Sequence, residues 1–267
     1  MNLASSPFLE FAPLRGVLLR ELRAALINRY FQVFSVLALL GGGATLIFSE
    51  DAQSIAVFIL QIALYFVSLF ALLAGISSAQ AEREEWEFLF TQPVPRSAYV
   101  MGKFVAYFSI FGAVLGLLFL PGLFAGASFS TLALLYFHTL LLAGAFLALG
   151  LIAGFVARDR AQSLIAGVTA WLLLLFGLDL IALFAARWTA FQRFPDIWVA
   201  LLMLNPLDAF RIEALFALEQ IPAEAASQTP LASWWVAHTG LWFGLIAVFW
   251  STALLALASL RLNHREE

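Results

Sequence analysis

Asp179 is an acidic side chain well inside a long apolar stretch of this 267-residue chain. An ionised side chain near the middle of a bilayer costs about 2.5–3.5 kcal/mol on insertion scales, so it must face other protein groups. It could line or gate a path through a helical bundle, or it could form a structural ion pair with Arg187 or Arg211. The two interpretations differ in what is lost on neutralising the acid: activity alone, or assembly as well.

Metal and catalytic chemistry find little support in the pattern of side chains. Soft metals bind clustered Cys, Met and His, but cysteine is absent, and His138, His238, Met101 and Met203 are scattered. No phosphate-binding glycine loop, Gly-x-Ser-x-Gly or His-Glu-x-x-His motif occurs. We therefore predict no metal, no cofactor and no catalytic residue in this chain. An intramembrane hydrolase that uses Asp179 is the alternative.

Residues 82–103 form a polar stretch between two long apolar runs. Its charged residues are Glu82, Arg83, Glu84, Glu85, Glu87, Arg96 and Lys103, and its aromatic residues include Trp86, Phe88 and Phe90. Acids followed by apolar residues predict a short amphipathic helix over 82–90, with negative charge at its favourable N-terminal end. Pro93 and Pro95 then end it, because proline cannot continue a helix. Exposed acids and aromatic rings suit a docked soluble subunit; the alternative is a solvated loop.

The composition indicates which elements position these groups. The chain is 63% hydrophobic and 12% charged, with a mean hydropathy of +0.94, whereas soluble domains are about 25% charged. One soluble core cannot bury so much apolar surface, so we predict an all-α membrane protein in contact with lipid. The net charge of −3 gives no reason to expect a nucleic-acid partner.

Six apolar runs approach or exceed the roughly 20 residues that a spanning helix needs. They cover residues 30–48, 54–79, 104–124, 131–157, 162–186 and 233–260. Pro121 and Gly122 are expected to break the third run near its end, and Trp234 and Trp235 to open the sixth at the membrane interface. Glycines four residues apart, which allow close helix packing in lipid, occur at Gly112/Gly116, Gly150/Gly154 and Gly240/Gly244.

Basic residues predict the orientation of the spans. Eleven Lys and Arg residues fall in the N-terminal segment, the 82–103 loop, the turn at Arg158–Arg160 and the C-terminal tail, and three fall on the other side. We therefore expect both termini in the cytoplasm. No short apolar stretch with a cleavage site precedes the first span, so we expect residues 1–267 to be the mature chain.

Two further segments flank the spans. Residues 8–29 repeat leucine and phenylalanine every three or four positions among arginines, which predicts an amphipathic helix on the membrane surface; a simple cytoplasmic leader is the alternative. Residues 187–232 are expected outside. Residues 197–204 are too few to cross a membrane, and Asn205-Pro206 interrupts the helix there. We therefore predict two short external helices, which could instead form a re-entrant pair. Residues 219–232 are expected to form an exposed loop.

The 82–103 loop resembles the first cytoplasmic loop of the permeases of type-2 ABC exporters. That pattern is E-x-E, an apolar pair, P-[VL]-x-R and then G-K; this chain has Glu82-Arg-Glu84, Leu89-Phe90, Pro93-Val94-Pro95-Arg96 and Gly102-Lys103. The resemblance implies that 82–90 is a coupling helix seated in a cytoplasmic ABC ATPase subunit, which binds the ATP and Mg²⁺. It also implies that 8–29 is the connecting helix and that Arg158–Arg160 is a second ATPase contact.

A second motif narrows the resemblance. Leu204-Asn205-Pro206-Leu207-Asp208-Ala209-Phe210-Arg211 is similar to the L-N-P-x-D-x-[YF]-R of the NosY-like permeases, which serve copper-site maturation of nitrous oxide reductase, and Phe176–Leu180 is similar to their apolar-Asp span. Glu85-Trp86 replaces the double glycine that often follows the acids in that group. The resemblance covers about residues 75–215.

The resemblance implies a homodimer in the bacterial inner membrane that is driven by an ATPase and docks a periplasmic (NosD-like) protein near Asn205–Arg211. The role of Asp179 stays open between a gate and a structural ion pair. The alternatives are an exporter of a lipid, glycan or hydrophobic natural product, and a membrane anchor or sensor that transports nothing.

Overall fold

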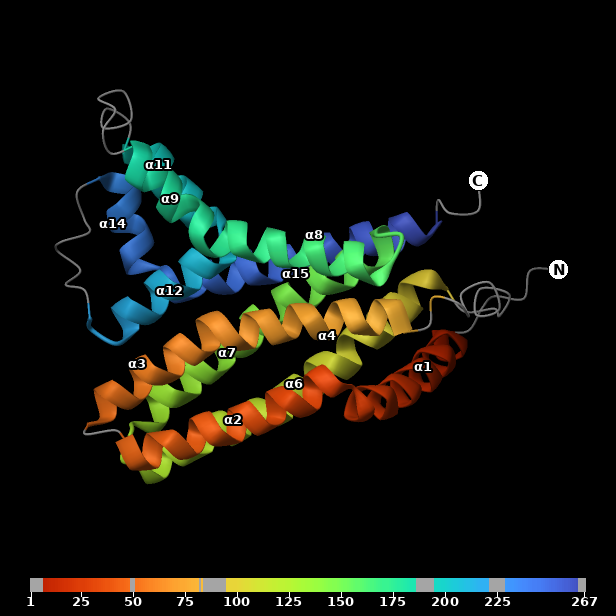
Figure 1. Ribbon diagram of the computed structural model, residues 1–267. Coiled ribbons are helices and arrows are strands. Elements are labelled where there is room, and N and C mark those ends of the chain that lie inside the picture. Colours follow the sequence, from red (N-terminus) through yellow and green to blue (C-terminus); the bar gives the residue numbers. More distant parts are fainter. Residues whose placement is uncertain are drawn as a thin grey trace.

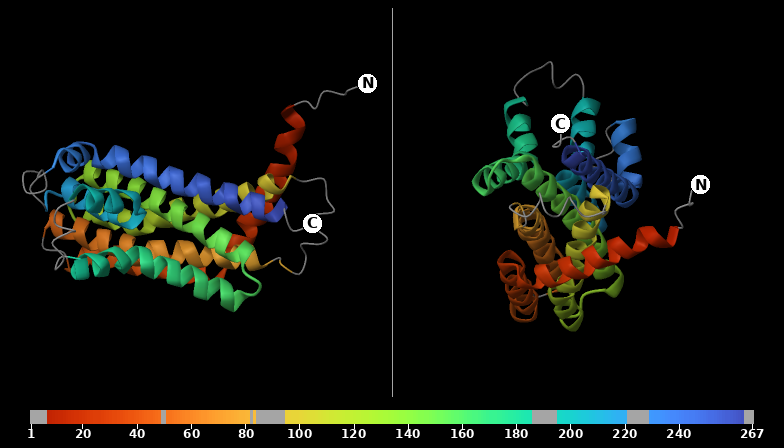
Figure 2. Two further views of the ribbon diagram at one scale, coloured as in Figure 1. Left: turned by 90° about the horizontal axis from the view of Figure 1, so that it is seen from above. Right: turned by 90° about the vertical axis from the view of Figure 1, so that its right-hand side faces the viewer.

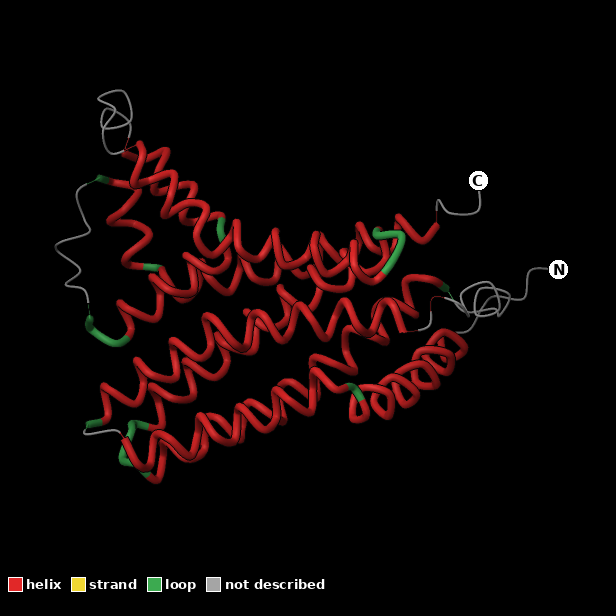
Figure 3. The backbone as a smooth tube through the Cα atoms, in the orientation of Figure 1, coloured by secondary structure: helices red, strands yellow, loops and turns green. Residues whose placement is uncertain are grey.

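The computed structural model describes residues 7–48, 51–81, 83, 95–185, 195–220 and 229–263. Every regular element in these residues is a helix (Figures 1 and 3). Six helices are long and apolar enough to cross a membrane: Arg29–Phe48, Ala52–Ala81, Arg96–Phe124, Phe129–Val156, Arg160–Ile181 and Thr239–Leu262. The predicted all-α, six-span architecture is confirmed.

Two of the spans contain a π-helical turn. The spans are α2 (Arg29–Phe48); α3 (Ala52–Ile62), η1 (Ala63–Val67) and α4 (Ser68–Ala81); α6 (Arg96–Phe124); α7 (Phe129–Val156); α8 (Arg160–Leu172), η3 (Leu173–Gly177) and α9 (Leu178–Ala185); and α15 (Thr239–Asn263). The other helices are α1 (Pro7–Ile27), α11 (Pro195–Leu204), α12 (Pro206–Ala217) and α14 (Pro230–Ala237). Turns of the π type often mark functional positions within helices.

Short polar side chains define where several helices begin. Asp51, Asp159, Asn205 and Thr229 each precede a helix and accept a hydrogen bond from a backbone N–H of its first turn. Such caps satisfy amides that have no acceptor within the helix. The charged turn predicted at Arg158–Arg160 therefore has a structural role, because its middle residue, Asp159, caps the start of α8.

The sequence and the structure differ at several boundaries. One is the start of the third span, because α6 begins at Arg96, inside the expected 82–103 loop. The helix α6 continues through Pro121 to Phe124 and does not break there. The run 233–260 divides at His238 into α14 and α15, so Trp234 and Trp235 lie in a separate short helix. Thr229 caps α14, so the end of the expected 219–232 loop is helical. Uniform hydropathy conceals such breaks, because it reports the surroundings of a segment and not its backbone.

The helix α1 lies at an angle to the other helices. It runs across one end of the bundle and away from it, whereas the spans run nearly side by side (Figure 2). The start of α1 and the end of α15 lie at this same end (Figure 1). We call it the basic end, because it holds Arg83, Arg96, Arg158, Arg160 and Arg261. An orientation across the bundle is the one expected of a helix at a membrane surface.

Glycine brings the second and fourth spans into backbone contact. A methyl group at Gly150 would overlap the carbonyl oxygen of Leu72, and one at Gly154 would lie 2.5 Å from Cβ of Ala79. On the facing helix, a methyl group at Gly75 would lie 2.5 Å from the carbonyl oxygen of Leu147. The pair Gly150/Gly154 is thus a true close-packing motif, and α4 and α7 form the rigid centre of the fold.

Candidate functional site: an ion-pair network at a re-entrant helix pair

The helices α11 and α12 form a re-entrant pair at the end opposite the basic end. Figure 1 shows α11 entering the bundle and α12 returning, with the tip of the pair at Asn205, the residue between them. Most of α12 is buried. Indole N–H groups of Trp242 and Trp250 on α15 donate to the carbonyl oxygens of Met203 (2.9 Å) and Leu204 (3.0 Å). The last span therefore holds the tip of the pair.

Four of the predicted site residues form one polar network. The guanidinium of Arg211 donates two hydrogen bonds to the carboxylate of Asp179, at 3.0 and 3.1 Å. It also donates to Asp208 at 2.6 Å. The amide nitrogen of Asn205 donates to the other oxygen of Asp208, again at 2.6 Å. The partner of Asp179 is thus Arg211, and Arg187 lies outside the described residues.

Asn205 connects this network to the fifth span a second time. Its amide nitrogen also donates to the carbonyl oxygen of Leu174, at 2.6 Å, within the π-helical turn η3. Pro206 follows at the first position of α12, where a missing N–H costs nothing. The structure therefore brings together all five residues that the sequence assigned to this end: Asp179, Asn205, Pro206, Asp208 and Arg211.

A parallel contact joins the two spans that contain π-helical turns. The indole N–H of Trp171 on α8 donates to the hydroxyl of Ser68 at 2.9 Å, and that hydroxyl donates to the carbonyl oxygen of Leu64 in η1. The α12 network and this contact thus hold the fifth span from two sides. Both involve backbone that departs from the regular α-helical pattern.

The fifth span is the one least covered by the rest of the chain. In an apolar stretch of 18 residues of this span, only 17% of the residues are buried, against 67% in the corresponding stretch of the fourth span. The side chain of Asp179 is 48% exposed and that of Arg211 is 30% exposed. Charged side chains are costly against lipid, so we expect another polar or protein surface to cover this face.

A second buried pair was missed by the sequence analysis. Nδ1 of His138 on α7 lies 2.9 Å from Oε1 of Glu213 on α12, and their side chains are 15% and 2% exposed. The sequence analysis counted His138 only among the scattered histidines and methionines. The available signal was Glu213 itself, an acid two residues after Arg211 in a segment that could re-enter the bundle.

At the basic end, a buried ion pair joins α1 to α6. Nζ of Lys103 lies 2.9 Å from both carboxylate oxygens of Glu21, and both side chains are 1% exposed. The ammonium also lies 5.0 Å from the centre of the Tyr99 ring, within reach of a cation–π interaction. The resemblance placed Lys103 in the coupling loop over 82–103; the structure places it inside α6, where it is buried and attaches the surface helix to the third span.

Three other basic residues at this end, Arg83, Arg96 and Arg160, each donate a hydrogen bond to a neighbouring segment. Arg83 donates to the carbonyl oxygen of Ala157 at 2.6 Å, next to Arg158. Arg96 donates to the carbonyl oxygen of Leu262 at the end of α15, and Arg160 donates to the hydroxyl of Tyr30 at 3.3 Å. The resemblance gave two ATPase contacts, the 82–103 loop and the Arg158–Arg160 turn. The start of the loop, at Arg83, therefore lies beside that turn.

The other residues predicted for ATPase coupling lie outside the described residues. They are Glu82, Glu84, Glu85, Trp86, Phe88 and Pro93. Their coupling role therefore stays a prediction.

Comparison with known proteins places these features in context. Residues 21–266 match a protein-family model described as ABC-2 family transporter protein. A search of curated proteins finds no match. The match includes all six spans, the re-entrant pair, the Glu21–Lys103 ion pair and the contact between His138 and Glu213.

Proposed function

The chain belongs to the ABC-2 family of transporter proteins, and we propose that it couples ATP-driven movement at its basic end to the re-entrant pair at the opposite end. It is a multi-pass membrane subunit of an ABC transporter. In this proposal ATP and Mg²⁺ bind to a separate ATPase subunit. The observation that carries the proposal is the network from Asp179 to Asn205, because it attaches a spanning helix to α12 through charged groups.

The basic end is proposed to face the cytoplasm of a bacterial inner membrane and to receive the ATPase. Its excess of arginine supports this orientation. The bond between Arg83 and the carbonyl oxygen of Ala157 supports a shared docking surface, because it holds the loop start against the Arg158–Arg160 turn. The coupling helix over 82–90 would then push on two connected segments. Glu84→Lys and Glu85→Lys should release the ATPase while the permease stays in the membrane.

A second copy of the chain is proposed to cover the fifth span. The fifth span is the least buried of the six spans, and its exposed face carries the Asp179–Arg211 pair. A polar or protein partner is therefore needed at this face. The chain has no cysteine, which allows a direct test. Ile165→Cys on the exposed face of α8 should form cross-linked dimers, and Leu39→Cys on the exposed face of α2 should not. The reverse result would place the dimer face elsewhere.

The finer proposal concerns what the transporter serves. The Asn205–Arg211 motif forms the tip and first turns of α12, and its resemblance to the NosY-like permeases favours a role in copper-site maturation of nitrous oxide reductase. The re-entrant pair would pass movement to a periplasmic, NosD-like protein and would not conduct bare copper. Copper flux through the reconstituted dimer without the periplasmic protein would argue against this version.

The central test neutralises Asp179 in the assembled transporter. The chain is co-expressed with its proposed ABC ATPase subunit, and complex yield and transport-linked ATP hydrolysis are measured in proteoliposomes. Asp179→Asn should leave complex yield intact and lower coupled hydrolysis by about tenfold, since a lost charge-assisted pair is worth about 1.5–3 kcal/mol. Asp196→Asn, at an exposed acid of α11, is the matched control. Full coupling in Asp179→Asn would refute the role of the network.

A further inference from the structure

The contact between His138 and Glu213 joins α12 to the centre of the bundle and has no part in the proposed coupling network. Nδ1 of His138 lies 2.9 Å from Oε1 of Glu213, and the glutamate side chain is 2% exposed. The described residues give neither Nδ1 of His138 nor Oε2 of Glu213 a partner in hydrogen-bond geometry. A buried acid and a buried base thus meet with two polar atoms unsatisfied, and each such atom in a folded interior needs an explanation.

The net charge of the pair depends on one proton. A neutral imidazole beside an ionised carboxylate would leave a negative charge in an apolar interior, and an imidazolium beside a protonated acid would leave a positive one. Both states are costly without a counter-charge. A single added proton makes the pair neutral overall, whether it lies on the ring or on the carboxyl group, because in such a pair the proton belongs to both groups.

The helices around the pair supply no counter-charge among the described residues. Phe243 packs edge-on against the imidazole, and α3, α4 and α7 carry no acidic or basic residue besides His138. The basic residues of α6 and α15 lie at the basic end. The other titratable groups near the pair have partners elsewhere or are exposed: Asp208 and Arg211 in the Asp179 network, Tyr65 beside Arg211, Tyr136 on the carbonyl oxygen of Gly112, His238 on that of Trp234, and the exposed Glu219.

We propose that His138 and Glu213 form a proton-binding site, which holds one added proton while α12 is seated and releases it to water when α12 withdraws. Withdrawal separates the acid on α12 from the base on α7 and hydrates both. In water above about pH 6.5 a histidine is neutral and a glutamate is ionised, so the separated groups hold no added proton. The seated state then binds one proton more than the withdrawn state, and a rise in pH above this value favours withdrawal. The proposal does not rest on coupling to an ATPase, since it concerns this chain alone.

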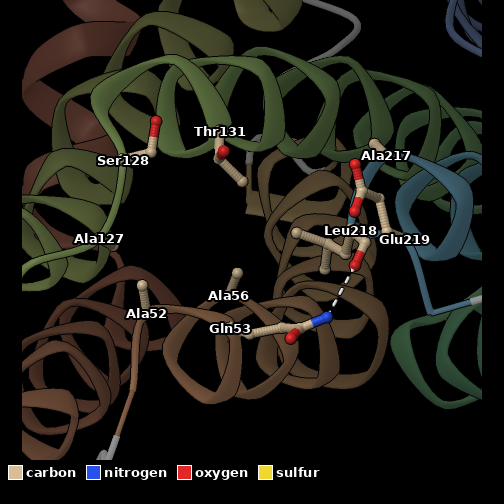
Figure 4. A pocket seen from close by; sticks show the side chains of 9 residues that line it. All are labelled: Ala52, Gln53, Ala56, Ala127, Ser128, Thr131, Ala217, Leu218 and Glu219. Carbon is tan, nitrogen blue, oxygen red and sulfur yellow. Dashed lines mark hydrogen bonds between the residues drawn. The ribbon is translucent and has the colours of Figure 1, made fainter.

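A cavity at the end opposite the basic end lets water approach the pair. Its volume is about 270 Å³, and Gln53, Ser128, Thr131 and Glu219 contribute polar groups to its lining, so it has room for several water molecules. Figure 4 shows residues of α3 on one side, residues of α7 on the other, and the end of α12 between them. Glu219 follows α12 with a φ of +54°, and Gln53 donates to the carbonyl oxygen of Leu218 at 3.0 Å, which fixes this end of α12 to α3.

The cavity and the pair lie on the same faces of two helices. Ala217 lines the cavity and follows Glu213 by four residues on α12, and Thr131 lines it and precedes His138 by seven residues on α7. Both spacings return to the same face of a helix. Leu135 lies between Thr131 and His138 along α7 and is 1% exposed. The apolar layer at Leu135 therefore separates the seated pair from the water of the cavity.

Labelling of a buried cysteine on α12 at different pH values tests the site in the purified full chain in detergent. The chain has no cysteine and Ala214 is 0% exposed, so Ala214→Cys should react with maleimide when α12 withdraws. The same reporter combined with His138→Gln/Glu213→Gln has no titratable pair, and its rate corrects for ionisation of the thiol. Free cysteine in the same solution gives this correction if the double variant does not fold.

The corrected rate should have two regimes between about pH 5 and about pH 9. Above about pH 6.5 it should rise about tenfold for each pH unit, because one proton leaves on withdrawal. Below that value it should be constant, because the freed histidine then takes up the proton that the pair gives up. A corrected rate that stays constant over the whole range would overturn the site.

Two single variants assign the proton to the two residues. Glu213→Gln should abolish the rise above about pH 6.5, because a neutral amide beside a neutral imidazole leaves no charge for a proton to cancel. His138→Gln should extend the rise below about pH 6.5, because the withdrawn state then has no histidine to protonate. A rise that survives Glu213→Gln would overturn the role of the acid, and identical profiles for His138→Gln and the unaltered pair would overturn that of the imidazole.

Discussion

His138 on α7 and Glu213 on α12 form a buried pair, with Nδ1 and Oε1 2.9 Å apart. The ring of Phe243 on α15 packs edge-on against the imidazole. A methyl group at Gly240 would lie 3.4 Å from the imidazole ring of His138, so the backbone of α15 also comes close to that imidazole. Three helices, α7, α12 and α15, therefore meet around this polar contact. We expect the contact to help hold α12 in place.

Replacing His138 should loosen α12. His138→Phe would remove the contact of the imidazole with the buried carboxyl group of Glu213, and a buried polar group left without a partner costs about 1–3 kcal/mol. The reporter is Ala214→Cys on α12, which is 0% exposed and would be the single cysteine of the chain. Maleimide labelling of this cysteine should be about tenfold faster or more when His138→Phe is added. His238→Phe, at an exposed histidine, is the control, and equal labelling in all three proteins would contradict the expectation.

Breaking the Glu21–Lys103 pair should detach α1. Lys103→Met leaves the buried Glu21 without its main partner, and Arg20 at 2.9 Å compensates in part, so we expect a loss of about 3 kcal/mol. The double variant Glu21→Gln/Lys103→Met should recover most of it. Unfolding in detergent provides the measurement, and Arg23→Met on the same helix is the control. A double variant no more stable than Lys103→Met would show that the pair is not the cause.

Adding a methyl group at Gly150 should force the second and fourth spans apart. The new group would overlap the carbonyl oxygen of Leu72, which cannot move without its helix, so Gly150→Ala should cost about 1–3 kcal/mol. Gly43→Ala has open space around it and should be neutral or stabilising by up to about 1 kcal/mol. The midpoint of thermal unfolding should fall in Gly150→Ala and should stay the same or rise in Gly43→Ala. A stable Gly150→Ala protein would show that α4 and α7 pack less closely than described.

Glu219→Gly should stabilise the fold. Glycine adopts a φ of +54° without the penalty of roughly 1–2 kcal/mol that other residues incur, so we expect a gain of about 1 kcal/mol in the free energy of unfolding. Glu219→Ala removes the carboxylate but keeps the strain, and it should not give this gain. Chemical unfolding of the three proteins distinguishes relief of strain from loss of charge.

Hydropathy predicted the six spans because burial in lipid requires long apolar runs. The position of α12 and the grouping of Asp179 with Arg211 also agree with the sequence, since an acid and a base in apolar surroundings need each other. The partner of Lys103 was not predictable: Glu21 lies 82 residues away, and no local pattern reports such a contact. The same is true of His138 and Glu213, which only tertiary packing brings together.

The two hydrogen-bond donors of the Asn205 side chain are both engaged, one by the carbonyl oxygen of Leu174 and the other by Asp208. The residue is 4% exposed, so withdrawing the tip of the re-entrant pair would strip two buried donors of their acceptors, at about 1–3 kcal/mol each. Lipid cannot replace those acceptors. We therefore expect that any movement withdrawing the pair needs water or other protein groups to accept the two hydrogen bonds that Asn205 gives up.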